Sequence, residues 1–279
     1  PNKITVDQIK TKKAELDKVD KANEYKMQRK ERIGIIGAGI QGVCTALFLK
    51  KKGFDVTLFD RDEPGNAASY GNAGHFSPYA SLQLNRTDVL SDVPAMLLSN
   101  RGPLALKWNY IPKMLPWFAR FIFNCSKTKM MHTAKYMHQI LDLALPAYDE
   151  LFEEIDLSGL VENKGIMYIW NDRDLKSREL EINIRNEIGA EQQLLSKKEI
   201  HDLEPNIRKI YHGGVFYKKA RHARNPKKIL LKLFDLFIKK GGKFEKKNVK
   251  SSLDINRDRN NRSIPHEAMS VLECRFGCW

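Results

Sequence analysis

The sequence predicts an α/β fold, and one continuous pattern carries most of that prediction. The short apolar run Ile33–Ile36 leads into Gly37-x-Gly39-x-x-Gly42, a helical stretch follows, and a second apolar run, Val56–Phe59, ends on Asp60. Strand, tight glycine turn, helix, strand and terminal acid in this order are typical of a dinucleotide-binding βαβ unit. Further along, short strands alternate with helical stretches. We therefore expect a Rossmann-like, FAD/NAD(P)-binding nucleotide domain and an incomplete, mixed α+β substrate domain.

Each part of the glycine turn has a physical role. Gly37 permits the sharp turn, Gly39 leaves room for a pyrophosphate, and Gly42 lets the helix pack closely on the sheet. The helix N-terminus offers N–H groups and a partial positive charge to the phosphates. Asp60 would accept hydrogen bonds from the ribose hydroxyls and would repel a 2′-phosphate. We expect a bound adenine dinucleotide rather than a structural turn, held by Gly37, Ala38, Gly39, Ile40, Gln41, Gly42 and Asp60.

The loop that follows Asp60 indicates which dinucleotide binds. Residues 61–79 are rich in Gly, Ala, Ser and Asn, whereas an NAD enzyme normally continues into another helix at this point. Such a loop offers many backbone amides to an extended ligand, which favours FAD. The alternative is a flexible surface loop, and the corresponding alternative function is that of an NAD-type Rossmann dehydrogenase.

Three stretches, Gly37–Gly42, Phe59–Arg61 and above all Tyr70–Pro78, resemble the FAD-dependent D-amino-acid dehydrogenases of the glycine and D-amino-acid oxidase superfamily. The resemblance continues, in the order of that family, through Gly165–Trp170, Leu195–Pro205, Gly213–Phe216, His222 and Asn225–Pro226. It implies FAD as cofactor and hydride transfer to the flavin from an amino acid, above all a D-amino acid. The electron acceptor stays open, and a membrane quinone is one candidate. The resemblance also implies that Arg61 binds the cofactor, that Asn72, Ala73, Gly74 and His75 lie near the flavin, and that the backbone of Val249 lies near the adenine.

The sequence identifies no catalytic residue and no metal site. In the resembled family, the arginine that binds the substrate carboxylate and the loop that covers the flavin come largely from a later part of the chain. His75 is the most interesting retained residue, with a loop histidine bonded to backbone as the alternative. The remaining histidines considered, and the four cysteines, lack the spacing of metal ligands: His132, His138, His212, His222, Cys44, Cys125, Cys274 and Cys278.

The charge and apolar content limit the partners. The net charge is +14, but Lys and Arg are scattered along the chain, so we do not expect nucleic-acid binding. The stretch Trp108–Phe123 mixes aromatic and basic residues in a way that suits a membrane surface; an ordinary helix-loop over the substrate cavity is the alternative. Without a long apolar run, we expect a cytoplasmic protein, with a peripheral position on the inner face of the membrane as the second possibility.

The expected organisation has four parts. Residues 1–30 form a polar extension, residues 31–80 and 211–255 the FAD-binding domain, residues 81–210 the substrate or cap domain, and residues 256–279 a disordered tail. Several local patterns support it: a proline-broken helical region 82–157, a helix ending at Gly189, an N-cap at Asn225 and a strand Lys243–Val249 that joins the first sheet. The resembled family continues well beyond residue 279. A truncated, alternatively spliced or frame-shifted product would explain this, as would a genuine short member, and an inactive remnant is a further alternative function.

Overall fold

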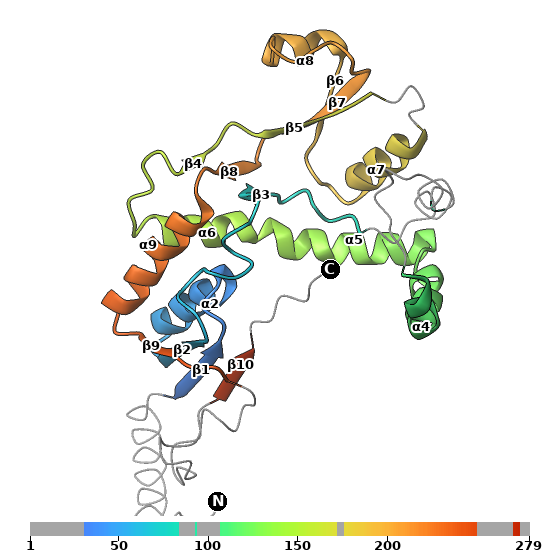
Figure 1. Ribbon diagram of the computed structural model, residues 1–279. Helices are drawn as coiled ribbons and strands as arrows, with labels where there is room; N and C mark the ends of the chain where they lie inside the picture. The colour runs from blue at the N-terminus through green and yellow to red at the C-terminus, as the bar shows by residue number, and fades with distance from the viewer. Residues whose placement is uncertain (1–30, 84–92, 94–106, 172–175, 250–269, 274–279) are drawn as a thin grey trace, which may run out of the picture. The chain divides into compact units, whose positions relative to one another are not determined.

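The computed structural model describes residues 31–83, 93, 107–171, 176–249 and 270–273, shown in colour in Figure 1. The chain divides into two compact units. The first unit holds the chain up to Asn72 and from Pro226 onward, and the second unit holds Ala73–Asn225.

The first unit is built on a parallel sheet of four strands in the order β10-β1-β2-β9. These strands are β1 (Arg32–Ile36), β2 (Asp55–Asp60), β9 (Lys243–Lys246) and β10 (Ser270–Glu273). Ile35, Val56 and Leu58 are fully buried, as expected for parallel strands covered on both faces. The two strands flanking the glycine turn, and the strand expected within Lys243–Val249, are confirmed.

Within the described residues, the first unit has two helices beside this sheet. Helix α2 (Ile40–Lys51) connects β1 to β2, which forms the predicted βαβ unit, and α9 (Pro226–Lys239) contacts α2. Pro226 stands at the first position of α9, where its missing N–H costs nothing. After the ends of α2 and α9, respectively, Gly53 and Gly241 have positive φ angles of 91° and 76°. The predicted apolar face of α9 is buried at Ile229, Leu230, Leu233 and Phe237.

Strand β10 corrects one prediction. Residues 256–279 were expected to form a disordered tail, yet Ser270–Glu273 pair in parallel with β1, from Ile33 opposite Ser270 to Ile36 opposite Glu273. This four-residue segment is too short to show a periodicity of its own, and its strand conformation follows from pairing with β1. The rest of that tail, and the extension at residues 1–30, lie outside the described residues.

The second unit contains two antiparallel sheets. One has the order β3-β8-β4, with β3 (His75–Phe76), β8 (Arg221–Ala223) and β4 (Val161–Glu162). The other has the order β5-β7-β6, with β5 (Ile166–Trp170), β7 (Gly213–Tyr217) and β6 (Gln193–Leu195). This confirms a separate antiparallel sheet that contains β5. Because β7 and β8 pair with strands of this unit, they belong here and not to the nucleotide domain, to which residues 211–225 were assigned.

The helices of the second unit correct a further prediction. Those whose bounds the structure describes are η1 (Trp108–Tyr110), α4 (Ile111–Phe123), α5 (Lys127–Asp142), α6 (Ala144–Phe152), α7 (Lys176–Glu187) and α8 (Lys197–Leu203). Pro112 and Pro146 lie in the first turns of α4 and α6, but Pro116 lies inside α4 and does not break it. It is the sixth residue of the helix, so the only N–H bond lost is the one to the Pro112 carbonyl. Pro94 and Pro103 lie outside the described residues.

Helix α7 was predicted from its apolar spacing, and its packing follows that spacing. Ile184 is buried with Met130 and Ala134 of α5, and Leu180 and Ile188 pack against the same cluster. Gly189, with a φ of 80°, follows the helix end, as the sequence indicated. The repeat of apolar residues four apart therefore marks the face that holds α7 on α5.

Candidate functional site

The glycine turn lies at the carboxyl end of β1 in the first unit. Gly37 has a φ of 108°, and its N–H donates to the Phe59 carbonyl at 2.7 Å, which joins the turn to the end of β2. A β-carbon added at Gly42 would lie 1.8 Å from the Gly37 carbonyl oxygen. A side chain at residue 42 is therefore incompatible with this turn, because the first turn of α2 passes directly over the end of β1.

The Asp60 carboxylate folds back onto the same turn. Its Oδ2 accepts the Ala38 N–H at 2.8 Å, and its Oδ1 accepts the Asp62 N–H at 3.0 Å. An ionised carboxylate has about four acceptor positions, so acceptor capacity remains for two ribose hydroxyls. Sequence reasoning expected the ribose role but not the bond to Ala38, which makes Asp60 part of the turn itself.

The N-terminus of α2 is arranged to receive an anion. Gly39 is the N-cap and provides no side-chain cap, and the first turn contains no acidic residue. The first N–H groups of a helix, here those of Ile40, Gln41 and Gly42, have no partner within the helix. The Ile40 N–H donates to the Ser69 hydroxyl at 3.1 Å. The dipole of α2 and its glycine cap thus favour negative charge at this point.

Ser69 is a site residue that sequence reasoning missed. Its side chain is 7% exposed, and a β-carbon added at Gly39 would lie 3.1 Å from its Oγ. Ser69 and Gly39 therefore line the same narrow space at the start of α2. The sequence signal was weak, since Ser69 is one of several small residues in the loop and no fixed spacing ties it to the glycines.

Val249 approaches this end of the sheet from far along the chain. It packs, with Ile36, against the buried Phe59, and it follows β9, whose neighbour in the sheet is β2. Arg61 is exposed directly after β2. The carboxyl ends of parallel strands are where open α/β sheets bind ligands. The structure thus brings Gly37–Gly42, Asp60, Arg61 and Val249 to one edge and adds Ser69.

The loop after Asp60 is attached to its surroundings. The Gly65 N–H donates to the Ala38 carbonyl at 3.1 Å, and Lys227 of α9 donates to Asn66 Oδ1 at 2.7 Å. The same ammonium lies 5.0 Å from the centre of the Tyr70 ring. The loop is thus tied to the glycine turn at one point and to α9 at another, which disfavours the alternative of a flexible surface loop. Asn72, exposed, is the last residue of the first unit before Ala73.

The next three predicted residues, Ala73, Gly74 and His75, belong to the second unit. Gly74 has a φ of 75°, and its carbonyl accepts the Ala223 N–H at 2.7 Å. His75 is exposed on β3 opposite His222 of β8, with 5.4 Å between the ring centroids. The described contacts therefore place His75 beside a second histidine. None of these contacts pairs His75 with a carboxylate that would help it act as a base. Nor do the described residues include a group of three His, Cys, Asp or Glu suited to a metal.

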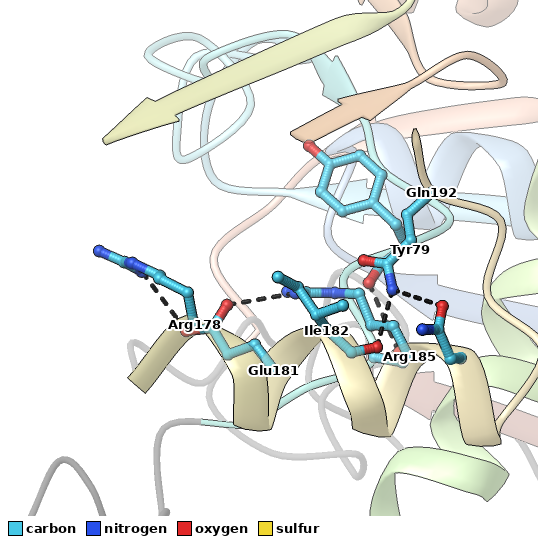
Figure 2. Close-up of polar contacts among 8 residues, drawn as sticks. Tyr79, Arg178, Glu181, Ile182, Arg185 and Gln192 are labelled. Carbon is cyan, nitrogen blue, oxygen red and sulfur yellow. Dashed lines mark hydrogen bonds and ion pairs between the residues drawn. The ribbon is translucent and has the colours of Figure 1, made fainter. Parts of the chain in front are cut away.

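A polar cluster on α7 contains two arginines, the side chains that could bind a substrate carboxylate (Figure 2). Glu181 lies between Arg178, at 3.6 Å, and Arg185, at 3.2 Å. Gln192 donates to the Ile182 carbonyl and to Asn186 Oδ1, both at 2.8 Å. Because the Glu181 carboxylate is bonded to Arg185, the positive charge of Arg185 is compensated within the helix. The cluster therefore fastens the segment after α7 and is not a carboxylate-binding site.

Comparison with known proteins gives the chain a family. Residues 32–268 match the family described as FAD dependent oxidoreductase (DAO). A D-amino-acid oxidase of Bradyrhizobium diazoefficiens is 32% identical over 203 residues, which are 72% of this chain and 48% of the relative. D-amino acid dehydrogenase 2 of Ralstonia nicotianae is 33% identical over 184 residues, which are 63% of this chain and 42% of the relative.

Among solved structures, glycine oxidase from Bacillus cereus aligns with a TM-score of 0.48 and 19% identity, over 84% of this chain and 50% of that chain. The chain spans about half the length of the curated relatives it matches. The family match includes the glycine turn, Asp60, Ser69 and Val249. The start of α2, with a glycine N-cap and no acidic residue in its first turn, fits the pyrophosphate of a dinucleotide. The chain therefore belongs to the FAD dependent oxidoreductase (DAO) family, and its cofactor is FAD.

Proposed function

We propose that this chain takes part in the oxidation of an amino acid, in particular a D-amino acid, to the imino acid, which water then converts to the keto acid and ammonia. The observation that carries the proposal is the arrangement at the edge of the parallel sheet. There the Asp60 carboxylate offers a hydrogen-bond acceptor, and the N-terminus of α2 offers a group that binds anions. Two relatives of the chain are named as D-amino-acid oxidase and D-amino acid dehydrogenase. When bound, FAD supplies the acceptor for the hydride from the substrate Cα.

In this proposal the residues of the first unit bind and orient the cofactor. The N–H groups of Gln41 and Gly42 would face the pyrophosphate, since the Ile40 N–H donates to Ser69 Oγ, and Gly39 would keep the approach open. Asp60 would accept the ribose hydroxyls, and its bond to Ala38 holds the turn in place. The backbone at Val249 would contact the adenine, and the Asn72–His75 segment would hold the flavin ring, as the family resemblance implies. Since both the hydride acceptor and the electron path belong to FAD, the described residues need supply no strong base if the amine enters neutral.

For the electron acceptor we propose a membrane quinone, and for the location a peripheral position on a membrane. The support is the exposed aromatic helix α4, whose large apolar side chains are accessible to solvent. Of the helices that the structure describes, none has the length and apolar character needed to cross a bilayer. Contact with the membrane would therefore be made at its surface.

The test is the absorption spectrum of the purified chain, recorded without oxygen before and after addition of D-alanine or L-alanine. We expect flavin bands in the resting protein and their loss with the D-amino acid. An artificial electron acceptor should then restore the oxidised spectrum. Protein that holds FAD but is reduced by neither isomer would contradict the proposed activity of this chain. Protein without flavin, even after incubation with FAD, would contradict the cofactor site itself.

A further inference from the structure

Helix α4 leaves most of its apolar surface uncovered. No residue of α4, whose positions are all described, is buried. The exposed fractions are 57% for Leu115, 49% for Trp117, 57% for Ile122 and 72% for Phe123. Soluble proteins rarely leave several large apolar side chains exposed together, and such patches mark interaction sites.

The helix is strongly two-sided. Ile111, Met114, Phe118 and Phe121 are half-buried and share one face of the helix at helical spacing. Leu115 and Ile122, seven residues apart, lie beside that face, so the apolar surface extends from the protein side out to solvent. Lys113 and Arg120, also seven apart and both exposed, lie on the opposite face. A wide apolar face opposite a basic face is the arrangement of helices that lie in the plane of a membrane surface.

The segment of the sequence that contains α4 has charges of one sign only. Residues 107–141 contain no Asp or Glu, whereas the whole chain has 34 acidic residues among 279, about one in eight. The same stretch contains six basic side chains, at Lys107, Lys113, Arg120, Lys127, Lys129 and Lys135. Lys129 Nζ lies 3.1 Å from the centre of the Phe123 ring. The most exposed apolar side chain of α4 therefore has a cation beside it, which matches a surface that is both apolar and negatively charged.

We propose that α4 and the six basic side chains of residues 107–141 form a docking surface for an anionic lipid bilayer. Leu115, Ile122 and Phe123 enter the boundary between headgroups and acyl chains, and the basic side chains contact anionic headgroups. This deepens, and rests on, the peripheral location proposed above. An acidic protein partner would pair with the basic side chains, but it would not explain the exposed aliphatic side chains. A neutral bilayer would not explain why residues 107–141 contain no acidic residue.

The experiment is flotation of the FAD-incubated 279-residue chain with large unilamellar vesicles. One set contains phosphatidylcholine with phosphatidylglycerol, and the other contains phosphatidylcholine alone. We expect binding to the first set, at least tenfold weaker binding to the second, and loss of binding at high salt. The double variant Ile122→Ser/Phe123→Ser and the double variant Lys113→Glu/Arg120→Glu should each weaken binding about tenfold or more.

The matched control is Ile210→Ser, which removes an aliphatic side chain that is 59% exposed but lies outside α4; it should float like the parent. Circular dichroism and flavin absorbance of all variants verify the fold. Equal binding to both vesicle types, or α4 variants that float like the parent, would overturn the proposal. So would α4 variants that alter only the size of the protein on gel filtration, since a second copy would then cover the helix. Flavin reduction is measured in the same samples, so a failure of the enzymatic proposal is seen separately from a failure of lipid binding.

Discussion

Replacement of Gly42 by alanine tests whether the turn requires glycine for its own geometry. The added β-carbon would lie 1.8 Å from the Gly37 carbonyl oxygen and 3.0 Å from its carbonyl carbon, whereas real β-carbons essentially never approach a heavy atom closer than 3.0 Å. Both obstructing atoms belong to the backbone, so no side chain can rotate away. Either α2 must shift from the sheet or the turn must open.

Both responses disturb contacts that stabilise the first unit. A shift of α2 disturbs the packing of Val43, Ala46 and Leu47, which are buried, and overpacking of this kind costs about 1–3 kcal/mol. Opening the turn also weakens the bond from the Gly37 N–H to the Phe59 carbonyl, which contributes about 1 kcal/mol. We therefore expect Gly42→Ala to lower the free energy of unfolding by about 2–4 kcal/mol.

The assay is urea unfolding followed by circular dichroism, with two further alanine variants for comparison. Gly71→Ala adds a β-carbon that meets no heavy atom within 4 Å, and its unfolding free energy should stay within about 0.5 kcal/mol of the parent. At Gly39 the φ is −80° and the nearest atom is the Ser69 hydroxyl oxygen at 3.1 Å. A hydroxyl can rotate, so Gly39→Ala should change stability little and FAD affinity more. The reasoning fails if Gly42→Ala and Gly71→Ala unfold at the same urea concentration.

Three further outcomes are expected. Gly39→Val should fold yet lose its flavin, because a branched side chain would occupy the space reserved for the pyrophosphate; full flavin occupancy after gel filtration would contradict this. Asp60→Ala should weaken FAD binding by about 1–3 kcal/mol through loss of a charged hydrogen bond, measured by flavin fluorescence titration; Asp55→Ala, at the other end of β2, is the control and should bind normally. The third outcome concerns the pH dependence of stability. Arg221 donates to both carboxylate oxygens of Asp149, and one of these bonds measures 2.8 Å. These bonds hold the pKa of Asp149 below its usual range. Because the pKa is lower in the folded state, the pair stabilises the fold above the unfolded pKa of about 3.9, and this contribution disappears as the pH falls through the folded pKa. The Asp149 side chain is 47% exposed, so the unfolding free energies of Asp149→Asn and the parent should differ by about 1 kcal/mol or less at neutral pH and converge in acid; a gap that does not change with pH would show that the ion pair is not its source.

The parts of the fold that sequence reasoning predicted are those with a local signal. The glycine spacing, the two apolar runs and Asp60 define the βαβ unit without reference to any distant residue. Helix α9 was predicted in the same way, because Asn225 and Pro226 mark its start and its apolar residues repeat at helical spacing. Local chemistry is sufficient in such elements, because each residue pattern agrees with only one kind of secondary structure.

Two of the missed features depend on partners far away in the chain, and a third depends on where a helix begins. Ser270–Glu273 is a strand because β1 lies beside it. The place of β7 follows from its pairing with β5 and β6. Pro116 was taken as a helix breaker, although its position in the second turn of α4 leaves most of the backbone bonds of the helix intact. A pattern within a few residues contains none of this information.

The candidate site also combines features that the local sequence predicts with contacts between distant segments that it does not predict. Its glycines were evident, but the contacts that hold them together join three separate segments. Asp60 accepts the Ala38 N–H, Ser69 accepts the Ile40 N–H, and the Gly65 N–H donates to the Ala38 carbonyl. The loop after β2 is thus bonded to the turn that precedes α2, and its small side chains have a structural reason beyond the ligand, since larger ones would prevent so close an approach of the two backbones. The turn is therefore shaped by the protein itself, so the loss of FAD expected for Gly39→Val need not be accompanied by loss of the fold.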